Sequence, residues 1–336
     1  MRCFLYLLTF LFGLSLQSGA EAFEHAVKGS AVPWTHTEFD ASSDKFSFAI
    51  HSDLTGGERP RIFETAMAQL ALLRPEFVIS VGDLIEGGGN REELIAEWES
   101  FDSRARIVGA PLFYVGGNHD LSSELERTVW KERYGPHYYH FRYRDVLFLV
   151  LDSEDMTFDR REEIASARAE AVEIYKTDGP EAFAETPYAK SPERTSGAIS
   201  TMQADHFVQA IEANPDVQHT FVFVHKPVWL RESGTPFFDI ESALTDRSYT
   251  VFNGHEHIYI HRERLGRDYI QLATTGGEQF PDKGLSEDHL TLVTVSGDRV
   301  DIVNLMLAGI RDKFGATPND GSDLCFAVAS CDETQQ

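Results

Sequence analysis

The chain has 336 residues, 42% of them hydrophobic, which is enough apolar material for one large domain or two small ones. Its formal net charge of −24 disfavours nucleic acid and anionic lipid as partners, because an acidic surface repels both. The sequence contains no lysine- and arginine-rich cluster that would offset this repulsion.

Residues 1–22 are typical of a signal peptide. Arg2 precedes an apolar run, residues 3–16, and small residues follow, among them Ala20 and Ala22. The run is shorter than the about 20 residues that a membrane span needs, so we expect cleavage after Ala20 or Ala22 and no stable membrane anchor. The mature protein would then be periplasmic or secreted. A retained N-terminal anchor is the alternative.

Cleavage would also remove Cys3 and leave Cys325 and Cys331, which lie in the expected C-terminal tail of residues 311–336. In an oxidising compartment two cysteines at this spacing can close a small disulfide loop, and two free thiols are the alternative. No base lies near either cysteine in the sequence, so we expect no catalytic role for them.

From residue 45 onward, short apolar runs alternate with helical patterns. Strands are expected over residues 45–53, 76–83, 110–115, 138–143, 146–154, 220–225 and 249–253, a hairpin turning at Gly266 over 258–272, and a last strand pair over 290–295 and 300–307. Helices are expected over 60–73, 92–104 and 122–134, with a further one opening at Thr201. The first of these has Pro60 at its start and places Phe63, Met67 and Leu70 on one face.

This alternation is typical of an α/β domain, here residues 45–310, in which loops at the carboxyl ends of strands carry the chemistry. Residues 155–196 interrupt it with a charged, alanine-rich segment that we expect to be a helical insertion. The segment is either a solvated excursion or a cap that shapes substrate access, and the sequence does not separate the two.

Polar side chains follow five of the apolar runs. They are Asp53, Asp83, Asn118 with His119, His225, and His255 with His257. If the strand ends meet at one rim, these carboxylates, imidazoles and the amide form a site for divalent transition metals. One such end, YVGGNHD at residues 114–120, predicts a tight turn, because Gly and Asn tolerate left-handed backbone angles.

The order Asp, Gly-Asp, Gly-Asn-His-Asp, His, Gly-His-x-His resembles the calcineurin-like metallophosphoesterase superfamily, over about residues 45–262 and the closing strands. The resemblance implies a four-layer α/β/β/α sandwich, in which two mixed sheets are flanked by helices. It also implies hydrolysis of a phosphate ester by attack of a metal-bound hydroxide.

The family's site residues can be carried over to the matching positions of this chain. The resemblance implies Asp53 and His257 as ligands of a first metal, Asn118, His225 and His255 as ligands of a second, and Asp83 as the bridge between them. Two divalent ions, Mn, Fe or Zn, would activate a water and clamp the phosphoryl oxygens. His119 would stabilise the developing charge and protonate the leaving oxygen.

The first motif departs from the family's pattern. It usually supplies Asp-x-His, and here Thr55 stands in place of the histidine. A hydroxyl is a weaker ligand than an imidazole, so we expect the first metal to be held less tightly. His51 is a poor substitute, because a residue inside the strand lies deeper than the rim.

The second motif departs as well. In protein serine/threonine phosphatases it resembles Gly-Asp-x-x-Asp-Arg-Gly, whereas residues 82–88 read GDLIEGG. Glu86 occupies the acid position and is expected to pair with His119 as part of the catalytic machinery, while Gly87 replaces the arginine. A typical protein phosphatase is therefore disfavoured. The missing tyrosine at the position of Glu86 argues against a purple acid phosphatase.

The sequence does not identify the residue that grips phosphate. Arg59, Arg61 and Lys226 lie near the motifs, although Lys226 could equally reach solvent from a strand end. Four further polar residues are left outside the site: His137, His140, Gln203 and His261.

The predicted function is that of an exported phosphoesterase acting on a small phosphoester, with monoesters and diesters both open. A non-catalytic extracytoplasmic binding protein with a weakened metal centre is the alternative, motivated by Thr55 and the missing arginine. The sequence does not indicate an oligomeric state.

Overall fold

The computed structural model of the chain describes residues 22–40, 45–231, 234–307 and 309–315. Almost all of the expected signal peptide, and the cysteines at positions 325 and 331, lie outside these residues. None of the described helices is both long and apolar enough to cross a membrane.

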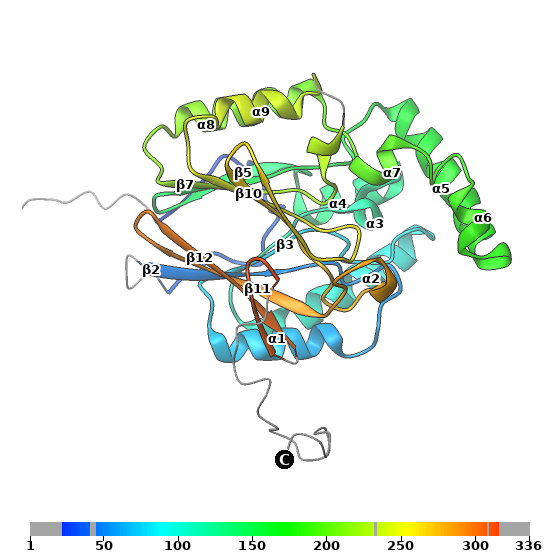
Figure 1. Cartoon of the computed structure of the whole chain (residues 1–336), viewed down its shortest axis with the longest axis horizontal. Coiled ribbons are helices and arrows are strands. Elements are labelled where there is room, and N and C mark those ends of the chain that lie inside the picture. Colours follow the sequence, from blue (N-terminus) through cyan, green and yellow to red (C-terminus); the bar gives the residue numbers. More distant parts are fainter. Residues whose placement is uncertain (1–21, 41–44, 232–233, 308, 316–336) are drawn as a thin grey trace, which may run out of the picture.

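Two mixed β-sheets lie face to face at the centre of the molecule (Figure 1). The first sheet has the order β1-β5-β6-β7-β8-β10-β9, with β1 (Phe23–His25), β5 (Tyr139–Tyr143), β6 (Val146–Val150), β7 (His219–Phe223), β8 (Tyr249–Asn253), β9 (Ile260–Arg264) and β10 (Arg267–Gln271). Strands β6, β7, β8 and β10 run parallel to one another. Their carboxyl ends therefore meet at one edge of the sheet.

The second sheet has the order β13-β12-β11-β2-β3-β4. Its strands are β2 (Lys45–His51), β3 (Val78–Ser80), β4 (Leu112–Phe113), β11 (His289–Ser296), β12 (Arg299–Met306) and β13 (Gly309–Asp312). Here β2, β3 and β4 are parallel, and β11, β12 and β13 extend the sheet in antiparallel fashion.

Helices cover the outer faces of both sheets, which confirms the expected α/β/β/α sandwich (Figure 1). The second sheet packs against α1 (Ile62–Leu73), α2 (Arg91–Ala105) and α4 (Glu124–Tyr134) through one buried apolar cluster. The first sheet packs against α8 (Thr201–Ala213) and α9 (Phe237–Ala243) through another. Each helix buries one apolar stripe, as Phe63, Met67 and Leu70 of α1 illustrate.

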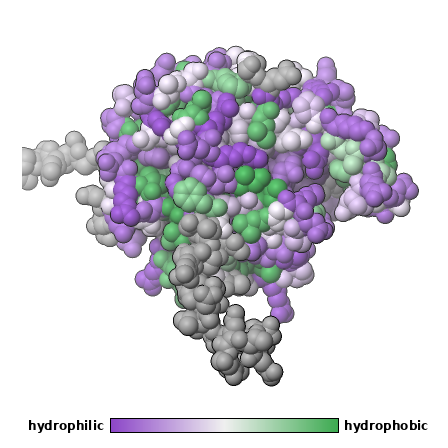
Figure 2. All heavy atoms as spheres, in the orientation of Figure 1, coloured by the Kyte–Doolittle hydropathy of each residue, from purple (hydrophilic) through white to green (hydrophobic). Residues whose placement is uncertain are grey.

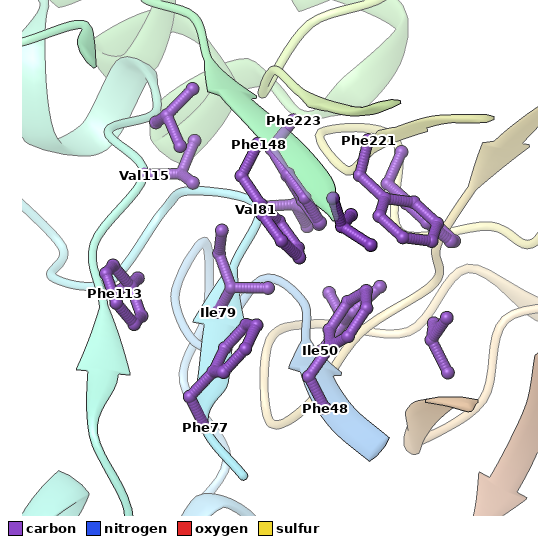
Figure 3. Close-up of a cluster of buried hydrophobic side chains, with 14 of the residues drawn as sticks. Phe48, Ile50, Phe77, Ile79, Val81, Phe113, Val115, Phe148, Phe221 and Phe223 are labelled. Carbon is purple, nitrogen blue, oxygen red and sulfur yellow. The ribbon is translucent and has the colours of Figure 1, made fainter. Parts of the chain in front are cut away.

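The largest apolar cluster fills the space between the sheets (Figure 3). Alternate residues of the strands point into it, because successive side chains of a strand face opposite sides. Phe48 of β2 stacks on Phe77 at 5.1 Å between ring centroids and meets Phe221 of β7 edge-on at 5.0 Å. Burying an aromatic ring of this size contributes about 2–3 kcal/mol. The contacts hold the two parallel strand sets in fixed relation.

The expected insertion forms three helices between β6 and α8: α5 (Phe158–Asp178), α6 (Pro180–Ala184) and α7 (Pro192–Ser196). We call residues 158–196 the helical insertion. It lies at one side of the sandwich, where α5 and α6 extend away from the sheets (Figure 1). Its own apolar cluster contains only Ile164, Ala171 and Tyr188 as buried residues.

The structure also contains elements that the sequence did not predict. Strand β1 pairs with β5, so the fold includes residues before position 45, and Trp34 belongs to the core. Helix α9 and strand β13 were not anticipated, and β13 runs into the expected tail. Pro60 precedes α1 and does not begin it, because Arg61 adopts a left-handed conformation at the helix N-cap.

The exterior is largely hydrophilic in the view of Figure 2, as the acidic composition leads one to expect. Three short 3-10 turns complete the structure, at Arg106–Val108, Val228–Leu230 and Pro281–Lys283.

Candidate metal centre

The polar residues that follow the parallel strands come together at one edge of the two sheets. They lie in five segments, residues 52–57, 81–87, 114–120, 224–227 and 254–257, which we call the strand-end loops. Asp83, His225 and His255 each offer a ligand atom, and these atoms lie within 4.8 Å of one another. Loops of both sheets thus contribute to one cluster.

One half of the site is closely assembled. His225 Nε2 lies 3.1 Å from Asp83 Oδ2 and 3.3 Å from Asn118 Oδ1, and all three residues are buried. Burial alone would raise the pKa of Asp83, but the charges of His225 and His119 hold it well below its usual value. Burial alone would likewise lower the pKa of His225, and Asp83 raises it to about 9. The two groups form a buried ion pair, in which a cation can replace the proton.

The other half of the site is sparser. His257 Nε2 lies 3.5 Å from Asp53 Oδ1, and Asp53 is fully buried. The hydroxyl of Thr55 donates to the backbone carbonyls of Ile85 and Asp83, at 2.8 and 3.2 Å. Thr55 therefore links the first two strand-end loops. His51, the possible substitute, packs against Phe rings on the α1 side and away from this rim.

Each imidazole of the cluster has one ring nitrogen fixed by a backbone carbonyl. The pairs are His225 Nδ1 with Val81 O at 2.9 Å, His257 Nδ1 with Glu278 O at 2.6 Å, and His255 Nε2 with Arg194 O at 2.6 Å. Such a bond fixes the tautomer and the orientation of the ring. It leaves the second nitrogen of each ring as an acceptor for a metal ion.

Three of the clustered residues have left-handed backbone conformations, which residues other than glycine rarely adopt. The φ angles are 55° at Asp83, 81° at His255 and 53° at His257. Such conformations cost about 1–3 kcal/mol each and persist where the surrounding structure enforces them. Their concentration at one rim marks this rim as a functional site.

The two glycines of YVGGNHD have a different role from the one expected. Neither Gly116 nor Gly117 has a positive φ angle, and Asn118 begins the short helix α3 (Asn118–Leu121). A Cβ atom on Gly117 would lie 2.2 Å from Asp83 Oδ1, and one on Gly116 would lie 2.3 Å from a Leu121 methyl. The glycines therefore provide space for close packing, and the left-handed turn predicted from them is wrong.

Asp120, which ends the same motif, was not assigned a role from the sequence. Its buried carboxylate accepts hydrogen bonds from the backbone N–H groups of Gly117 at 2.7 Å, Leu84 at 3.0 Å and Ile85 at 3.2 Å. Burial and the nearby Asp83 charge raise its pKa to about 8, while the backbone donors act in the opposite direction. Asp120 fixes two strand-end loops to each other.

His119 points into the site beside the cluster. Its Nδ1 lies 2.6 Å from the backbone carbonyl of Glu86, whereas the Glu86 carboxylate is 3.8 Å away. That carboxylate accepts the N–H groups of Gly57 and Glu58 instead, each at 3.0 Å. The two side chains therefore lie within ion-pair distance, as expected, while the shorter contact of the ring is with the main chain. Glu86 holds the ring in place through its carbonyl.

An arginine that the sequence reasoning missed contacts His119 from the helical insertion. Arg168 Nη2 lies 3.1 Å from His119 Nε2 and 3.4 Å from Nδ1. Burial lowers the pKa of His119, Asp83 opposes this, and the Arg168 cation lowers it further. The neutral ring can donate from Nδ1 to Glu86 and accept from Arg168 at Nε2.

Two of the cations considered from the sequence, Lys226 and Arg59, are engaged elsewhere. Lys226 Nζ pairs with Glu154 Oε1 at 2.7 Å and is buried, and Arg59 pairs with Asp288. Arg61 is the N-cap residue of α1. The polar residues left outside the site also have partners of their own: His137 with Arg127, His140 with His206, Gln203 with Asp152, and His261 with Asp268.

Comparison with known families decides the identity of this arrangement. The model of the calcineurin-like phosphoesterases matches residues 46–259, which include every strand-end loop. The chain belongs to the calcineurin-like phosphoesterase family. It is a metallophosphoesterase, as the order of the motifs predicted.

Solved structures are similar to this phosphoesterase at low sequence identity. A dimetal phosphatase from Danio rerio is 14% identical with a TM-score of 0.53, over 81% of this chain and 99% of that one. A purple acid phosphatase from yellow lupin, Lupinus luteus, is 11% identical with a TM-score of 0.48, over 80% of this chain and 53% of that one. A comparison with curated proteins gave no match.

Membership of this family implies a dinuclear centre of divalent metals, and the residues of this phosphoesterase fit one. The fit rests on the fixed imidazoles, whose second nitrogens remain available, and on the buried carboxylates among them. Mixed nitrogen and oxygen donors suit borderline transition metals.

Proposed function

We propose that this phosphoesterase is exported and hydrolyses a small phosphate ester at the strand-end loops. Asp83, Asn118, His225 and His255 would hold one divalent ion, Asp53 and His257 would hold the other, and Asp83 would bridge the two. The bound ions, Mn, Fe or Zn, would activate a water and neutralise the phosphoryl charge. The ion at Asp53 would be the weaker one, because Thr55 replaces an imidazole there.

His119 would be the acid of the reaction. Its Nδ1 is fixed by the Glu86 carbonyl, so Nε2 is the nitrogen left to face substrate. Burial lowers the pKa of this ring, the neighbouring Asp83 charge opposes that shift, and the Arg168 cation adds to it. From that position Nε2 would stabilise the developing charge and pass a proton to the leaving oxygen.

One observation carries the proposal. Ligand atoms of Asp83, His225 and His255, which are up to 172 positions apart in the sequence, lie within 4.8 Å of one another. A purely structural rim would not need three carbonyl-fixed imidazoles directed inward. The N-terminal sequence supports export, and the low lysine and arginine content supports a small substrate over a nucleic acid.

The test is hydrolysis of p-nitrophenyl phosphate and bis-p-nitrophenyl phosphate by the mature protein with Mn²⁺. We expect His119→Ala to lower the turnover of the preferred ester by about 100-fold or more. His206→Ala, in which the changed histidine lies on α8 and pairs with His140, is the matched control and should retain parental activity. Metal analysis should give about two equivalents per chain.

Two results would contradict the proposal. Parental activity in the His119→Ala variant would remove the role given to that residue. A protein that binds no Mn, Fe or Zn under replete conditions would favour the non-catalytic binding protein. Export is tested separately, by N-terminal sequencing of the protein recovered outside the cytoplasm, and a chain that still begins at Met1 would exclude cleavage.

A further inference from the structure

One positive charge of the helical insertion, that of Arg168, reaches His119 at the catalytic edge of the sandwich. Arg168 lies on α5, 49 positions from His119 along the chain, and its guanidinium Nη2 is 3.1 Å from His119 Nε2. Nε2 is the nitrogen that faces substrate in the proposed reaction. A phosphoryl oxygen beside Nε2 would therefore also lie within reach of the guanidinium.

Arg168 differs from the other arginines of the insertion. Each of the others has a carboxylate partner: Arg160 with Glu193, Arg161 with Glu124, and Arg194 with Glu256. Arg168 forms no ion pair with any carboxylate in the described part of the chain. It is half-buried, and a partly desolvated cation without a counter-ion is unfavourable until an anion joins it.

The position of Arg168 is fixed by packing. Ile164, Arg168 and Ala171 are spaced by four and three residues, so they lie on one face of α5. Ile164 and Ala171 are buried in the small apolar cluster of the insertion. Arg168 lies on the face of α5 that carries this cluster, and from there its guanidinium contacts His119.

The strand-end loops themselves supply no free cation at this point. Gly87 follows Glu86, and a Cβ atom there would lie 2.0 Å from the backbone oxygen of His119, so this position has no room for a side chain. Lys226 is held by Glu154 at 2.7 Å and by the Glu193 carbonyl at 3.1 Å. The phosphate-binding cation has to come from outside these loops.

We propose that Arg168 binds the non-bridging phosphoryl oxygens of the substrate, which makes the helical insertion part of the active site. This inference rests on the proposed function, because it takes the substrate to be a phosphate ester held beside His119. The planar guanidinium can donate two parallel hydrogen bonds to a phosphoryl group. On substrate binding, the guanidinium would turn from the His119 ring to the phosphoryl oxygens.

The charge of the substrate then decides how much Arg168 contributes to substrate binding. A phosphomonoester carries up to two negative charges and three non-bridging oxygens, whereas a diester carries one charge and two such oxygens. Bidentate binding leaves a further oxygen of the monoester for the metal ions. The arrangement favours monoesters.

The test measures phosphate binding directly. The Mn²⁺-loaded mature protein is titrated with inorganic phosphate by calorimetry, in parent, Arg168→Ala, Arg168→Lys, Arg161→Ala and Lys176→Ala forms. We expect Arg168→Ala to weaken binding by about 10-fold or more, since charge-assisted hydrogen bonds are lost. Arg168→Lys should recover part of the loss.

Two controls separate binding from a structural role. Arg161→Ala removes the ion pair that joins α5 to α4, and Lys176→Ala removes an exposed charge near the end of α5. Both should bind phosphate as the parent does. In turnover of p-nitrophenyl phosphate, Arg168→Ala should raise KM while Arg161→Ala leaves it unchanged.

Unchanged phosphate affinity in Arg168→Ala would overturn the inference, as would equal losses in Arg161→Ala or a parent protein that binds no phosphate. The proposed function fails in a different way. If the parent hydrolysed no phosphoester but bound phosphate through Arg168, the inference would stand and the catalytic proposal would not.

Discussion

The strand-end loops and the helical insertion meet at the same site but are built differently. The loops follow strands whose side chains fill a large core between two sheets, and Asp53, His225 and Asp120 within them are fully buried. The insertion has three buried residues in its own cluster and extends from the side of the sandwich (Figure 1). A rigid part therefore holds the candidate metal ligands, and a lightly packed part adds to them.

The two regions touch at several points, one of which is the ion pair of Arg194 with Glu256. Arg168 contacts His119, the Arg194 carbonyl fixes His255 Nε2, and the Glu193 carbonyl accepts from Lys226. Two of these contacts use the main chain of α7, so the insertion also orients a candidate metal ligand. We conclude that changes in the loops should affect metal binding and stability, while changes in the insertion should act mainly on substrate binding.

The largest effect is expected at Asp83, which we propose as the bridge between the two metal ions. Asp83→Asn should lower the metal content below one equivalent and reduce hydrolysis by at least about 100-fold, because the bridging charge is lost. Metal analysis and turnover measure both. Asp205→Asn, on the exposed face of α8, is the control. Full metal content in Asp83→Asn would show that this residue is no ligand.

A matched pair of core substitutions tests the difference in packing directly. Ile79→Ala, between the sheets, should lower the free energy of unfolding by about 3–4 kcal/mol, because a tightly packed core leaves a cavity. Ile164→Ala, in the insertion, should cost about 1–2 kcal/mol, because its small cluster can collapse. Urea unfolding measures both. Equal losses would mean that the insertion is as firmly packed as the sandwich.

Asp120 should matter for stability although it binds no substrate. Asp120→Asn places an amide NH₂ against backbone N–H donors of two strand-end loops, and we expect a loss of about 2 kcal/mol in the free energy of unfolding. The measurement is urea unfolding of the EDTA-treated protein at pH 9, above the Asp120 pKa of about 8, where the carboxylate is ionised. A loss confined to metal affinity, with stability unchanged, would contradict this role.

The smallest predicted effect is on the pH dependence of stability, through His219 in strand β7 of the first sheet. Burial, and after it the Arg267 charge, lowers the pKa of His219 to about 4 from the ordinary 6.5. The unfolded chain then binds the proton more readily, so this contribution to stability is present above pH 6.5 and is lost as the pH falls toward 4. When the pH is lowered from 7.5 to 5, the free energy of unfolding of the metal-free protein should fall by about 1–2 kcal/mol less in His219→Gln than in the parent. An identical loss of unfolding free energy in the parent and in His219→Gln would contradict the lowered pKa of His219.

Much of the fold followed from local pattern. Short apolar runs identified most strands of the sandwich, and the spacing of Phe63, Met67 and Leu70 identified α1. The pattern failed where elements are short or irregular. Strand β1 has three residues, and the left-handed Arg61 moved the start of α1 past Pro60. Such features depend on neighbours that lie far away in the sequence.

The candidate site divides in the same way. The sequence by itself determined the residues that follow the parallel strands, because strand ends are readable from hydrophobicity and the residue types there are specific for metals. Only the tertiary structure showed that Glu86 acts through its carbonyl, that Asp120 joins two loops, and that Arg168 reaches His119. These contacts depend on how helix α5 docks and how the loops pack against each other. Hydrophobic periodicity along the chain does not predict such packing.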